Sequence, residues 1–542
     1  MYRIHQIKLN IDEPKDRIQS KIIKKIGYKD MIITDYNIVK ESIDARDKSN
    51  IKWVYTVDFN CATLHNPKKY LNLAANPKLN LEIAPNMSYK EVEQGSIQLE
   101  NRPVIVGFGP CGMFAGLLLA TRGYKPLIIE RGNMVEQRVK DVKEFWDKAI
   151  LNPESNVQFG EGGAGTFSDG KLTTGIKDSR IRKVLEEFVV AGADPDILYK
   201  QKPHIGTDVL QQVVANIRKT IISYGGEIRF GTRLDDIIVK KKKIIGVKVS
   251  TDQVDMRDES DQVDEPKEIN GEGRLVEEIP TENLILAIGH SARDTFRMLF
   301  EKGIAMEQKP FSIGVRVEHP QKLIDQSQYG NIKALPPADY KLSYHCQNGR
   351  GVYTFCMCPG GIVIGAASQI GGVVTNGMSN RKRNSGVANS ALLCDVKTTD
   401  FNSVHPLAGV FFQEKYEKLA FESGGGTYKL PKTTWKNFRD NNQDAQPVIN
   451  SLPEFAVESI REAMPHMGKY LQGFDGDDVV MTAVETRSSS PVKFDRGDQC
   501  QGTFEGLYPG GEGAGYAGGI MSASCDGIKI AEKIIGKYKP FI

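Results

Sequence analysis

Residues Pro103–Gly132 carry the strongest structural signal in this chain. The apolar strand Val104–Val106 comes first, the helix-forming run Met113–Arg122 follows, and the apolar strand Pro126–Ile129 comes last. Between the first strand and the helix stands G-F-G-P-C-G, which matches the G-x-G-x-x-G turn of dinucleotide-binding units. Because all these parts follow in the expected order, the segment predicts a βαβ unit that binds a dinucleotide. The alternative is an ordinary βαβ unit whose glycines are incidental.

Each conspicuous residue of this turn has a physical role in that interpretation. Gly107 permits a tight turn out of the strand, Gly109 lets the backbone approach a pyrophosphate, and Gly112 lets the helix pack close to the sheet. The pyrophosphate then lies at the helix N-terminus, where free N–H groups and the helix dipole favour negative charge. Glu130, at the end of the second strand, is placed to accept hydrogen bonds from a ribose diol.

A second glycine-rich stretch, Asn156–Leu172, is too rich in glycine for a regular helix or strand. Its backbone N–H groups are suited to a diphosphate or to one face of a flat ring. Phe159, Phe167 and Leu172 supply apolar anchors that a freely moving loop does not need. We therefore expect it at the nucleotide site, with a flexible surface loop as the alternative.

A third stretch near the C-terminus predicts FAD as the nucleotide. Leu507–Tyr508 is a short strand end, and Gly510–Gly513 is a turn that contains Glu512. Gly518–Gly519 then opens the apolar helix Ile520–Ile535. An acidic residue in such a turn can bind a ribityl hydroxyl, and a helix N-terminus can face phosphate or the flavin as negative charge develops on it. No second strand-linked G-x-G-x-x-G appears, so a separate NAD(P) domain is not expected.

Composition limits the function classes. The 542 residues carry a net charge of +3, which is too small to indicate nucleic acid as a partner. No secretory signal or membrane-spanning segment is visible, and the eight cysteines are scattered, which favours a reducing cytoplasm and no membrane partner.

The predicted fold class is α/β, with a Rossmann-like FAD-binding domain, an inserted antiparallel-sheet α+β substrate domain and a small N-terminal α/β domain. Alternating strand patterns between residues 300 and 480 indicate the insertion. In the N-terminal domain, strand patterns at Ile4–Ile11, Asp35–Ser42 and Ile51–Phe59 and a helical pattern at Pro14–Ile26 predict the order strand, helix, strand, strand. Asn76–Gly95 is expected to be a linker to the FAD-binding domain. The polar, acidic stretch Asp252–Glu278 is expected to be an extended or mobile hairpin loop without function. The predicted boundaries are 1–95 for the N-terminal domain, 96–300 for the first part of the FAD-binding domain (with 200–280 partly peripheral), 301–480 for the substrate domain and 481–542 for the C-terminal part of the FAD-binding domain.

Five motifs support a resemblance to a known family: FGEGGAGTFSDGKL, AIGHSARDT, CMCPGG, ETRSSSP and GLYPGGEGAGYAGGI. They resemble the two-domain FAD-dependent oxidoreductases of the glutathione-reductase superfamily, in the branch without a separate NAD domain. More narrowly, they resemble a bacterial family of FAD-dependent dehydrogenases that has a short N-terminal α/β domain and no established substrate. The resemblance implies that Arg138 meets the FAD phosphates and that the backbone near Leu234 reads the adenine edge. Glu512 stands where such proteins more commonly have Asp.

The residues predicted to bind the cofactor come from the three glycine-rich stretches and from positions near them. The predicted residues are Gly107, Gly109, Pro110, Cys111, Gly112, Glu130, Arg131, Arg138, Gly162, Gly163, Ala164, Gly165, Thr166, Leu172, Leu234, Ala287, Gly289, Gly511, Glu512, Gly518, Gly519 and Ile520.

Three side chains are candidates for catalysis: Arg487, His290 and Lys171. Arg487 suits a substrate carboxylate or a reduced-flavin anion, and the alternative is a salt bridge with Glu485 or a phosphate clamp. His290 suits a proton donor, and the alternative is helix capping or packing. Lys171 and its neighbour Asp169 are expected to touch FAD or substrate.

Cys356 and Cys358 form a C-x-C pair near the end of a predicted strand. A redox pair is one interpretation, but flavin disulfide reductases use a wider spacing, so structural or substrate-lining thiols are preferred. A metal site with His345 and Cys346 matches no standard zinc spacing, and no metal is predicted.

The sequence thus predicts a FAD-dependent oxidoreductase that acts as a dehydrogenase or reductase on a small organic substrate, with NAD(P)H as a possible transient electron donor. The alternatives are an NAD(P)H-dependent flavin monooxygenase, an RNA-associated flavoprotein, for which the modest charge is unfavourable, and a flavin-bearing scaffold without turnover.

Overall fold

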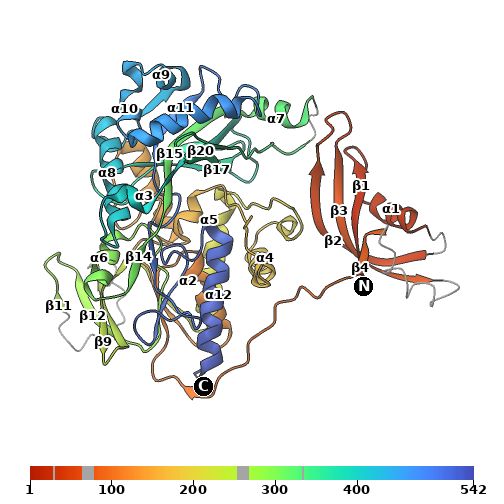
Figure 1. Cartoon of the computed structure of the whole chain (residues 1–542). Coiled ribbons are helices and arrows are strands. Elements are labelled where there is room, and N and C mark those ends of the chain that lie inside the picture. The colour runs from red at the N-terminus through yellow and green to blue at the C-terminus, as the bar shows by residue number, and fades with distance from the viewer. Residues whose placement is uncertain (28–30, 64–78, 253–267, 332–334, 542) are drawn as a thin grey trace.

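The computed structural model describes residues 1–27, 31–63, 79–252, 268–331 and 335–541. Figure 1 shows a small N-terminal module joined by an extended segment to a larger body, in which a parallel and an antiparallel sheet are found. The predicted mixed α/β fold is confirmed at this level. None of the described helices is both long and apolar enough to cross a membrane.

The N-terminal module is a four-stranded sheet with one helix. Its elements are β1 (Tyr2–Asn10), α1 (Arg17–Ile26), β2 (Met31–Asp44), β3 (Lys52–Thr63) and β4 (Leu81–Ile83), in the sheet order β2-β3-β1-β4. Helix α1 packs through Ile18, Ile22 and Ile26, whose spacing of four residues places them on one buried face. The strand–helix–strand–strand order agrees with the sequence. The predicted linker Asn76–Gly95 differs, because β4 lies within it, and residues 76–78 lie outside the described part.

The parallel sheet forms the base of the larger body. Its strands are β24 (Leu507–Pro509), β13 (Leu284–Leu286), β6 (Val104–Val106), β7 (Leu127–Ile129) and β8 (Glu227–Arg229), in that spatial order. All five strands are short, and β6, β7, β13 and β24 are buried on both faces, which is typical of a sheet covered by helices. The accompanying helices are α2 (Pro110–Thr121), α3 (Val135–Lys148), α4 (Arg180–Val190), α5 (Thr207–Ser223), α6 (Arg293–Glu301) and α12 (Gly519–Lys537).

Helices α2 and α12 pack against each other although about 400 residues of chain separate them. A Cβ at Gly527 of α12 would lie 2.1 Å from the carbonyl oxygen of Cys111 in α2, so this close approach requires glycine. The contact brings the C-terminal helix beside the first glycine turn, as the FAD prediction requires.

A smaller antiparallel sheet extends from the parallel one. Its strands follow the order β11 (Glu268–Ile269), β12 (Leu275–Pro280), β10 (Lys243–Thr251) and β9 (Thr232–Lys240). The predicted hairpin loop Asp252–Glu278 contains regular strand structure at its described end, where β11 and β12 pair antiparallel. Strand β12 also pairs with β10 along six residues and buries Val276 and Ile279. Residues 253–267 of that prediction lie outside the described part. The acidic composition made the strand hard to recognise, since Glu277 and Glu278 are both exposed and break the alternation of apolar and polar residues.

The large antiparallel sheet forms the other half of the body. Its order is β16 (Ser343–His345), β17 (Gly351–Cys358), β20 (Val387–Val396), β15 (Phe311–Pro320), β22 (Val480–Glu485) and β21 (Lys432–Thr434). The hairpin β18 (Ile362–Ala366) and β19 (Val374–Met378) lies beside it, with helices α7 (Gln321–Tyr329), α8 (Ala408–Ser423), α9 (Trp435–Arg439), α10 (Gln446–Ile449) and α11 (Glu454–Gly468).

The sequence did not reveal two inner strands of this sheet, β20 and β22. Both are buried almost throughout, so neither shows the alternation of apolar and polar residues that marks a half-exposed strand. The boundary predicted between residues 480 and 481 falls at the start of β22, so the sheet extends past it.

Short pairings join the parts. These are β14 (Met306–Gln308) with β23 (Val492–Phe494), and β5 (Ile97–Gln98) with β25 (Tyr538–Lys539). The N-terminal module contacts the body through Glu41 of β2, whose N–H donates to the Tyr199 carbonyl at 2.8 Å and whose carbonyl accepts from the Gln201 N–H at 2.9 Å.

Candidate functional site

A cavity of about 2050 Å³ opens between the parallel sheet, the antiparallel sheet and the N-terminal module. All three glycine-rich stretches contribute to its wall, through Gly107 and residues 109–111, through residues 163–165, and through residues 510–512 and 515–520. Pockets for one small ligand or cofactor are typically about 300–1,000 Å³. The cavity is therefore large enough for a dinucleotide and a second molecule.

The first glycine turn lies at the carboxyl ends of β6 and β13, where open α/β sheets bind ligands. Gly107 has φ +98°, and a Cβ there would lie 2.4 Å from the Ala287 carbonyl oxygen, so the turn requires glycine. Helix α2 then begins at Pro110, and the N-cap residue Gly109 supplies no side-chain cap. Its first N–H groups are thus directed toward the cavity end of the helix, as an anion site requires.

Glu130 is buried and ties the first two glycine stretches together. Its carboxylate accepts hydrogen bonds from the N–H groups of Phe108 at 2.8 Å, Gly132 at 2.9 Å and Gly160 at 3.0 Å. A carboxylate offers about four acceptor positions, so one remains for a ribose hydroxyl. The carboxylate also lines the cavity, which makes the predicted ribose contact compatible with its structural role.

Arg138 organises the second glycine stretch from behind. It is fully buried and donates to the carbonyls of Asn156 at 2.9 Å, Val157 at 3.0 Å and Glu161 at 2.6 Å. Burial lowers the pKa of this guanidinium to about 10. The resemblance implies that Arg138 meets the FAD phosphates, but the structure places it outside the cavity wall, with its donors taken by loop carbonyls.

The third stretch places Glu512 and the start of α12 at the cavity. A Glu512 oxygen lies 3.4 Å from the Gly519 N–H, and the other lies 3.5 Å from His290 Nδ1. Burial acts to raise the pKa of Glu512, but His290, the Gly519 N–H and the charge of Lys309 outweigh it, so the pKa lies below its usual value. Glu512 therefore carries a negative charge beside His290.

At two positions in the cavity wall, the packing of the described residues does not require glycine. A Cβ at Gly109 would meet ordinary contact at 3.7 Å, and a Cβ at Gly518 would meet nothing within 4 Å among the described residues. Neither residue has a positive φ: the values are −76° and −147°. Space kept free at both helix starts fits a ligand that approaches the backbone, so the residues present suit FAD.

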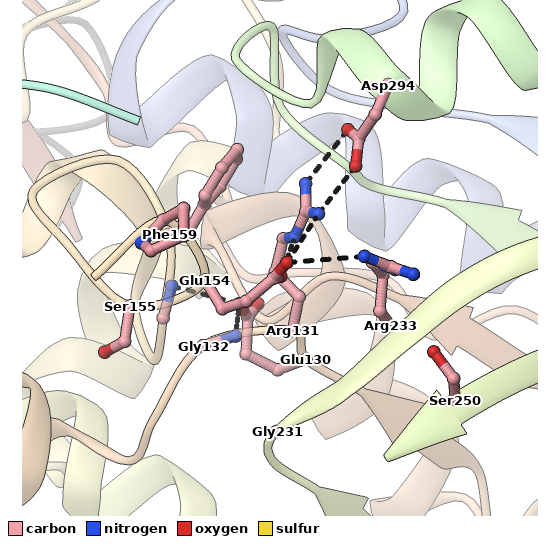
Figure 2. A network of polar contacts seen from close by, with 12 residues as sticks. Glu130, Arg131, Gly132, Glu154, Ser155, Phe159, Gly231, Arg233, Ser250 and Asp294 are labelled. Carbon is pink, nitrogen blue, oxygen red and sulfur yellow. Dashed lines mark hydrogen bonds and ion pairs between the residues drawn. The ribbon is translucent and has the colours of Figure 1, made fainter. Parts of the chain in front are cut away.

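A network of charged side chains lies next to Glu130 (Figure 2). Arg131 donates to Glu154 at 2.8 Å and to Asp294 at 2.7 Å, and its guanidinium lies 4.5 Å from the centre of the Phe159 ring. Arg233 reaches the same Glu154 at 3.5 Å. Arg131, Phe159 and Arg233 line the cavity together with the buried Leu234. A flat apolar floor framed by arginines suits an adenine ring. That the backbone near Leu234 reads the adenine edge stays a prediction.

Arg487 lines the cavity, but most of its donors are already used. Its Nε and Nη2 bind Glu417 at 3.1 and 2.8 Å, and its Nη1 donates to Ser291 at 2.9 Å and Ser368 at 2.7 Å. Arg293 donates two hydrogen bonds of 2.7 Å to the carboxylate of the same Glu417. The alternative of a salt bridge between Arg487 and Glu485 is not what the structure shows. Glu417, which no sequence motif marked, instead holds both arginines in place.

Lys171 also lines the cavity, and its Nζ lies 4.0 Å from the buried carboxylate of Asp169. Asp169 is bound by Arg383 and Ser379 from the antiparallel half, so it fastens the second glycine stretch to that half. Lys171 is thus the member of this cluster that is free to face a ligand.

Lys309 is a cavity residue that the sequence analysis missed. It stands between β14 and β15, where no motif marks it, and burial lowers the pKa of its ammonium while the charge of Glu512 opposes that shift. Lys309 lies in a short connection between two strands, where no sequence pattern distinguishes it. Only its place beside the third glycine-rich stretch in the folded protein shows that it belongs to the site.

The structure brings most of the predicted site residues together. The predicted residues that line the cavity are Gly107, Gly109, Pro110, Cys111, Glu130, Arg131, Gly163, Ala164, Gly165, Leu234, Ala287, Gly289, Gly511, Glu512, Gly518, Gly519, Ile520, Lys171, His290 and Arg487. The predicted residues outside the lining are Gly112, Arg138, Gly162, Thr166 and Leu172, which pack behind it.

Among the described residues, no group of three or more His, Cys, Asp or Glu side chains is arranged to hold a metal ion. All eight cysteines are free thiols. Cys346, from the alternative metal set, lies in the core of the antiparallel half and donates to the Ser459 carbonyl.

Comparison with known proteins adds the family. Residues 310–488 match the family described as "FAD-dependent protein, C-terminal domain-like", and residues 1–60 match a domain of unknown function. Among solved structures, the flavin-dependent brominase Bmp2 aligns with a TM-score of 0.36 at 12% identity over 81% of this chain and 80% of that chain. Glycine oxidase from Bacillus cereus aligns with a TM-score of 0.31 at 12% identity over 80% and 95%.

A protein of Clostridium beijerinckii, described as uncharacterized, is 42% identical over 556 residues, which cover 99% of both chains. The match over residues 310–488 agrees with the glycine-lined cavity in identifying FAD as the cofactor. The chain therefore belongs to the family of this Clostridium beijerinckii protein and depends on FAD.

Proposed function

We propose that this protein is a FAD-dependent oxidoreductase, a dehydrogenase or reductase that acts on a small organic molecule. The observation that carries the proposal is the cavity itself: three glycine-rich stretches form one side, and side chains of the antiparallel half form the other. Its volume of about 2050 Å³ leaves room beside a dinucleotide. A site of this shape supports chemistry between a held cofactor and a substrate.

The chain's own residues divide the binding work. The backbone at Gly107–Gly112 and the start of α2 would hold the diphosphate, Glu130 the ribose, and Arg131 with Leu234 the adenine side. The backbone at 163–165 and 511–519 would hold the ring system. When bound, FAD supplies two-electron redox chemistry at its ring. We further propose that the protein belongs to the branch of the glutathione-reductase superfamily that has no separate NAD domain.

The remaining wall supplies orientation and proton control for the substrate. Ser312 and Tyr353 share a hydrogen bond of 2.7 Å on the antiparallel side, and both line the cavity. His290 lies on the opposite side beside the charged Glu512, with its Nδ1 3.5 Å from a carboxylate oxygen. Lys309 and Lys171 add positive charge, so an anionic organic substrate such as a carboxylate fits the wall best. NAD(P)H remains a candidate electron donor within this proposal.

The test is anaerobic reduction of the purified protein against a panel of small organic acids, amino acids and hydroxy acids, followed by flavin absorbance. We expect a yellow protein whose flavin absorbance is bleached by at least one member of the panel. NADPH is tested alone as an electron donor in a separate sample. A colourless protein that takes up no FAD would refute the proposal. Rapid NADPH consumption with peroxide release would instead favour the monooxygenase alternative.

A further inference from the structure

Two thiols lie at different depths on the antiparallel wall of the cavity. Cys356 lines the cavity, whereas Cys358 is fully buried behind it. Both are on β17, whose pairing with β20 slips by one residue between Phe355 and Cys358. This bulge adds one residue to the strand and re-aims its side chains, so that neighbouring positions no longer alternate strictly. Cys356 is thus partly exposed at the cavity, and the thiol of the buried Cys358 donates to the Cys356 carbonyl at 3.3 Å.

The charges that face this pair come from every element packed around it. Arg316 of β15 lies with Nη1 3.5 Å from the Cys356 carbonyl oxygen and 3.8 Å from the Cys358 sulfur. Lys171, from the second glycine stretch, adds a positive charge, and Glu485 of β22 and Asp169 add negative ones. Glu485 is neutralised by two bonds from Arg316, at 2.8 and 3.2 Å.

The balance of these groups favours a thiolate at Cys356. Interaction with the Cys358 thiol lowers the pKa of Cys356, burial opposes that shift, and Lys171 and Arg316 lower the pKa further. The same pairing and burial raise the pKa of Cys358 well above its ordinary value. The two thiols titrate as a pair, and the cavity-facing member loses its proton first.

We propose that Cys356 and Cys358 form a redox-active dithiol on the cavity wall, in which Cys356 attacks a small-molecule disulfide and Cys358 resolves the adduct. An accessible thiolate with a buried partner thiol beside it is the arrangement that thiol–disulfide exchange requires. The site is additional to the FAD segments, and it functions as a thiol centre whether or not the proposed oxidoreductase activity is found.

The exchange balances in two steps. The Cys356 thiolate attacks one sulfur of the disulfide, the S–S bond breaks, and one thiolate leaves, which gives a mixed disulfide on Cys356. The Cys358 sulfur then attacks Cys356, its proton passes to the second leaving thiolate, and a Cys356–Cys358 disulfide forms. The small disulfide is reduced by two electrons and the protein dithiol is oxidised by two.

The first experiment measures alkylation of the full-length protein with iodoacetamide between pH 5 and pH 9, with peptide mass spectrometry. Cys61 is the internal control, because it is also partly exposed and burial raises its pKa. We expect Cys356 to react roughly tenfold faster than Cys61 at pH 7, with a midpoint below the value of about 8.5 for free cysteine. Equal rates, or a midpoint at or above that value, would overturn the proposal.

The second experiment exposes the protein to glutathione disulfide and follows intact mass. Wild type should form an internal Cys356–Cys358 disulfide, C358S should retain glutathione on Cys356, and C356S should form neither. Each variant is checked for FAD content so that a folding defect is recognised. Persistent glutathione on wild-type Cys356, or an unchanged mass with all three proteins, would contradict the proposal. Since none of these readouts depends on turnover, the result is separate from the fate of the proposed oxidoreductase activity.

Discussion

Single buried residues shape this cavity from outside its wall. Arg138 is the main example: its three hydrogen bonds to Asn156, Val157 and Glu161 fix a stretch that contains too many glycines to hold a shape alone. The sequence revealed that an arginine stood near the site, but not that loop carbonyls would occupy its donors. Backbone acceptors become visible only when the loop is folded around the side chain.

Replacement of Arg138 should therefore loosen the second glycine stretch. In R138M three buried carbonyls lose their donors, and each unsatisfied buried polar group costs about 1–3 kcal/mol. We expect a loss of stability of about 3 kcal/mol or more and weaker FAD retention, measured by denaturant unfolding and flavin absorbance after gel filtration. The control is R182M, whose partly exposed pair with Glu186 should matter by less than about 1 kcal/mol. Similar stability of the two variants would show that Arg138 is not needed for the loop.

Gly109 and Gly518 are predicted to be required by the cofactor rather than by the fold. Because a Cβ fits the protein at both positions, G109A and G518A should fold with a melting temperature near that of wild type without FAD. Each added methyl should crowd the ligand and lower FAD occupancy roughly tenfold or more, measured by flavin content and equilibrium titration. G271A, at another open position, is the matched control. Unchanged occupancy in both variants would contradict the assignment of these helix starts to FAD.

At the scale of elements, the Arg293–Glu417–Arg487 cluster connects α6, α8 and the segment after β22. Burial alone would raise the pKa of Glu417, but the two guanidiniums outweigh it and hold that pKa well below its ordinary value. The carboxylate is thus charged in the folded protein at a pH where it is protonated in the unfolded chain. Its contribution to stability is present above about pH 4.5 and is lost as the pH falls through the lower folded value.

The variant E417Q should remove this pH dependence together with its stabilisation. Two buried arginines then lack their counter-charge, so we expect a loss of about 3 kcal/mol or more at pH 7. Below pH 4.5 the difference from wild type should shrink. The measurement is denaturant unfolding at pH 3.5, 5 and 7, with E414Q as the control on the same helix, where the carboxylate is partly exposed. A difference that stays constant across this range would contradict the assigned ionisation.

For the whole molecule, contacts around Lys15 and Glu41 join the N-terminal module to the body at the cavity. Lys15 and the buried Glu41 form an ion pair of 2.6 Å within the module, and the backbone of Glu41 bonds to Tyr199 and Gln201 of the body. Several residues of the module, including Lys15, Glu41 and Trp53, line the cavity. Contacts between the module and the body therefore affect access to the site.

Weakening this contact should separate the module without removing the cofactor. E41A removes the carboxylate that holds Lys15, whose Nζ donates to the Tyr199 hydroxyl of the body at 3.5 Å. We expect a larger radius of gyration by small-angle scattering with unchanged FAD content. E82A, which removes an exposed carboxylate of the same module, is the control. If the two variants scatter alike, Glu41 does not hold the module in place.

The sequence by itself determined the βαβ unit, the three glycine-rich stretches and FAD as the nucleotide, because these depend on local rules: glycine for close backbone approach, strand and helix periods, and an acid at a strand end. Folding decided what no local rule contains. It brought together Gly109, Gly163 and Gly518, joined Glu417 to two arginines, and placed Lys309 and Cys356 on the cavity wall. It also buried β20 and β22 so completely that their sequences do not alternate between apolar and polar residues. These features depend on contacts between residues far apart in the chain, and such contacts exist only in the packed structure.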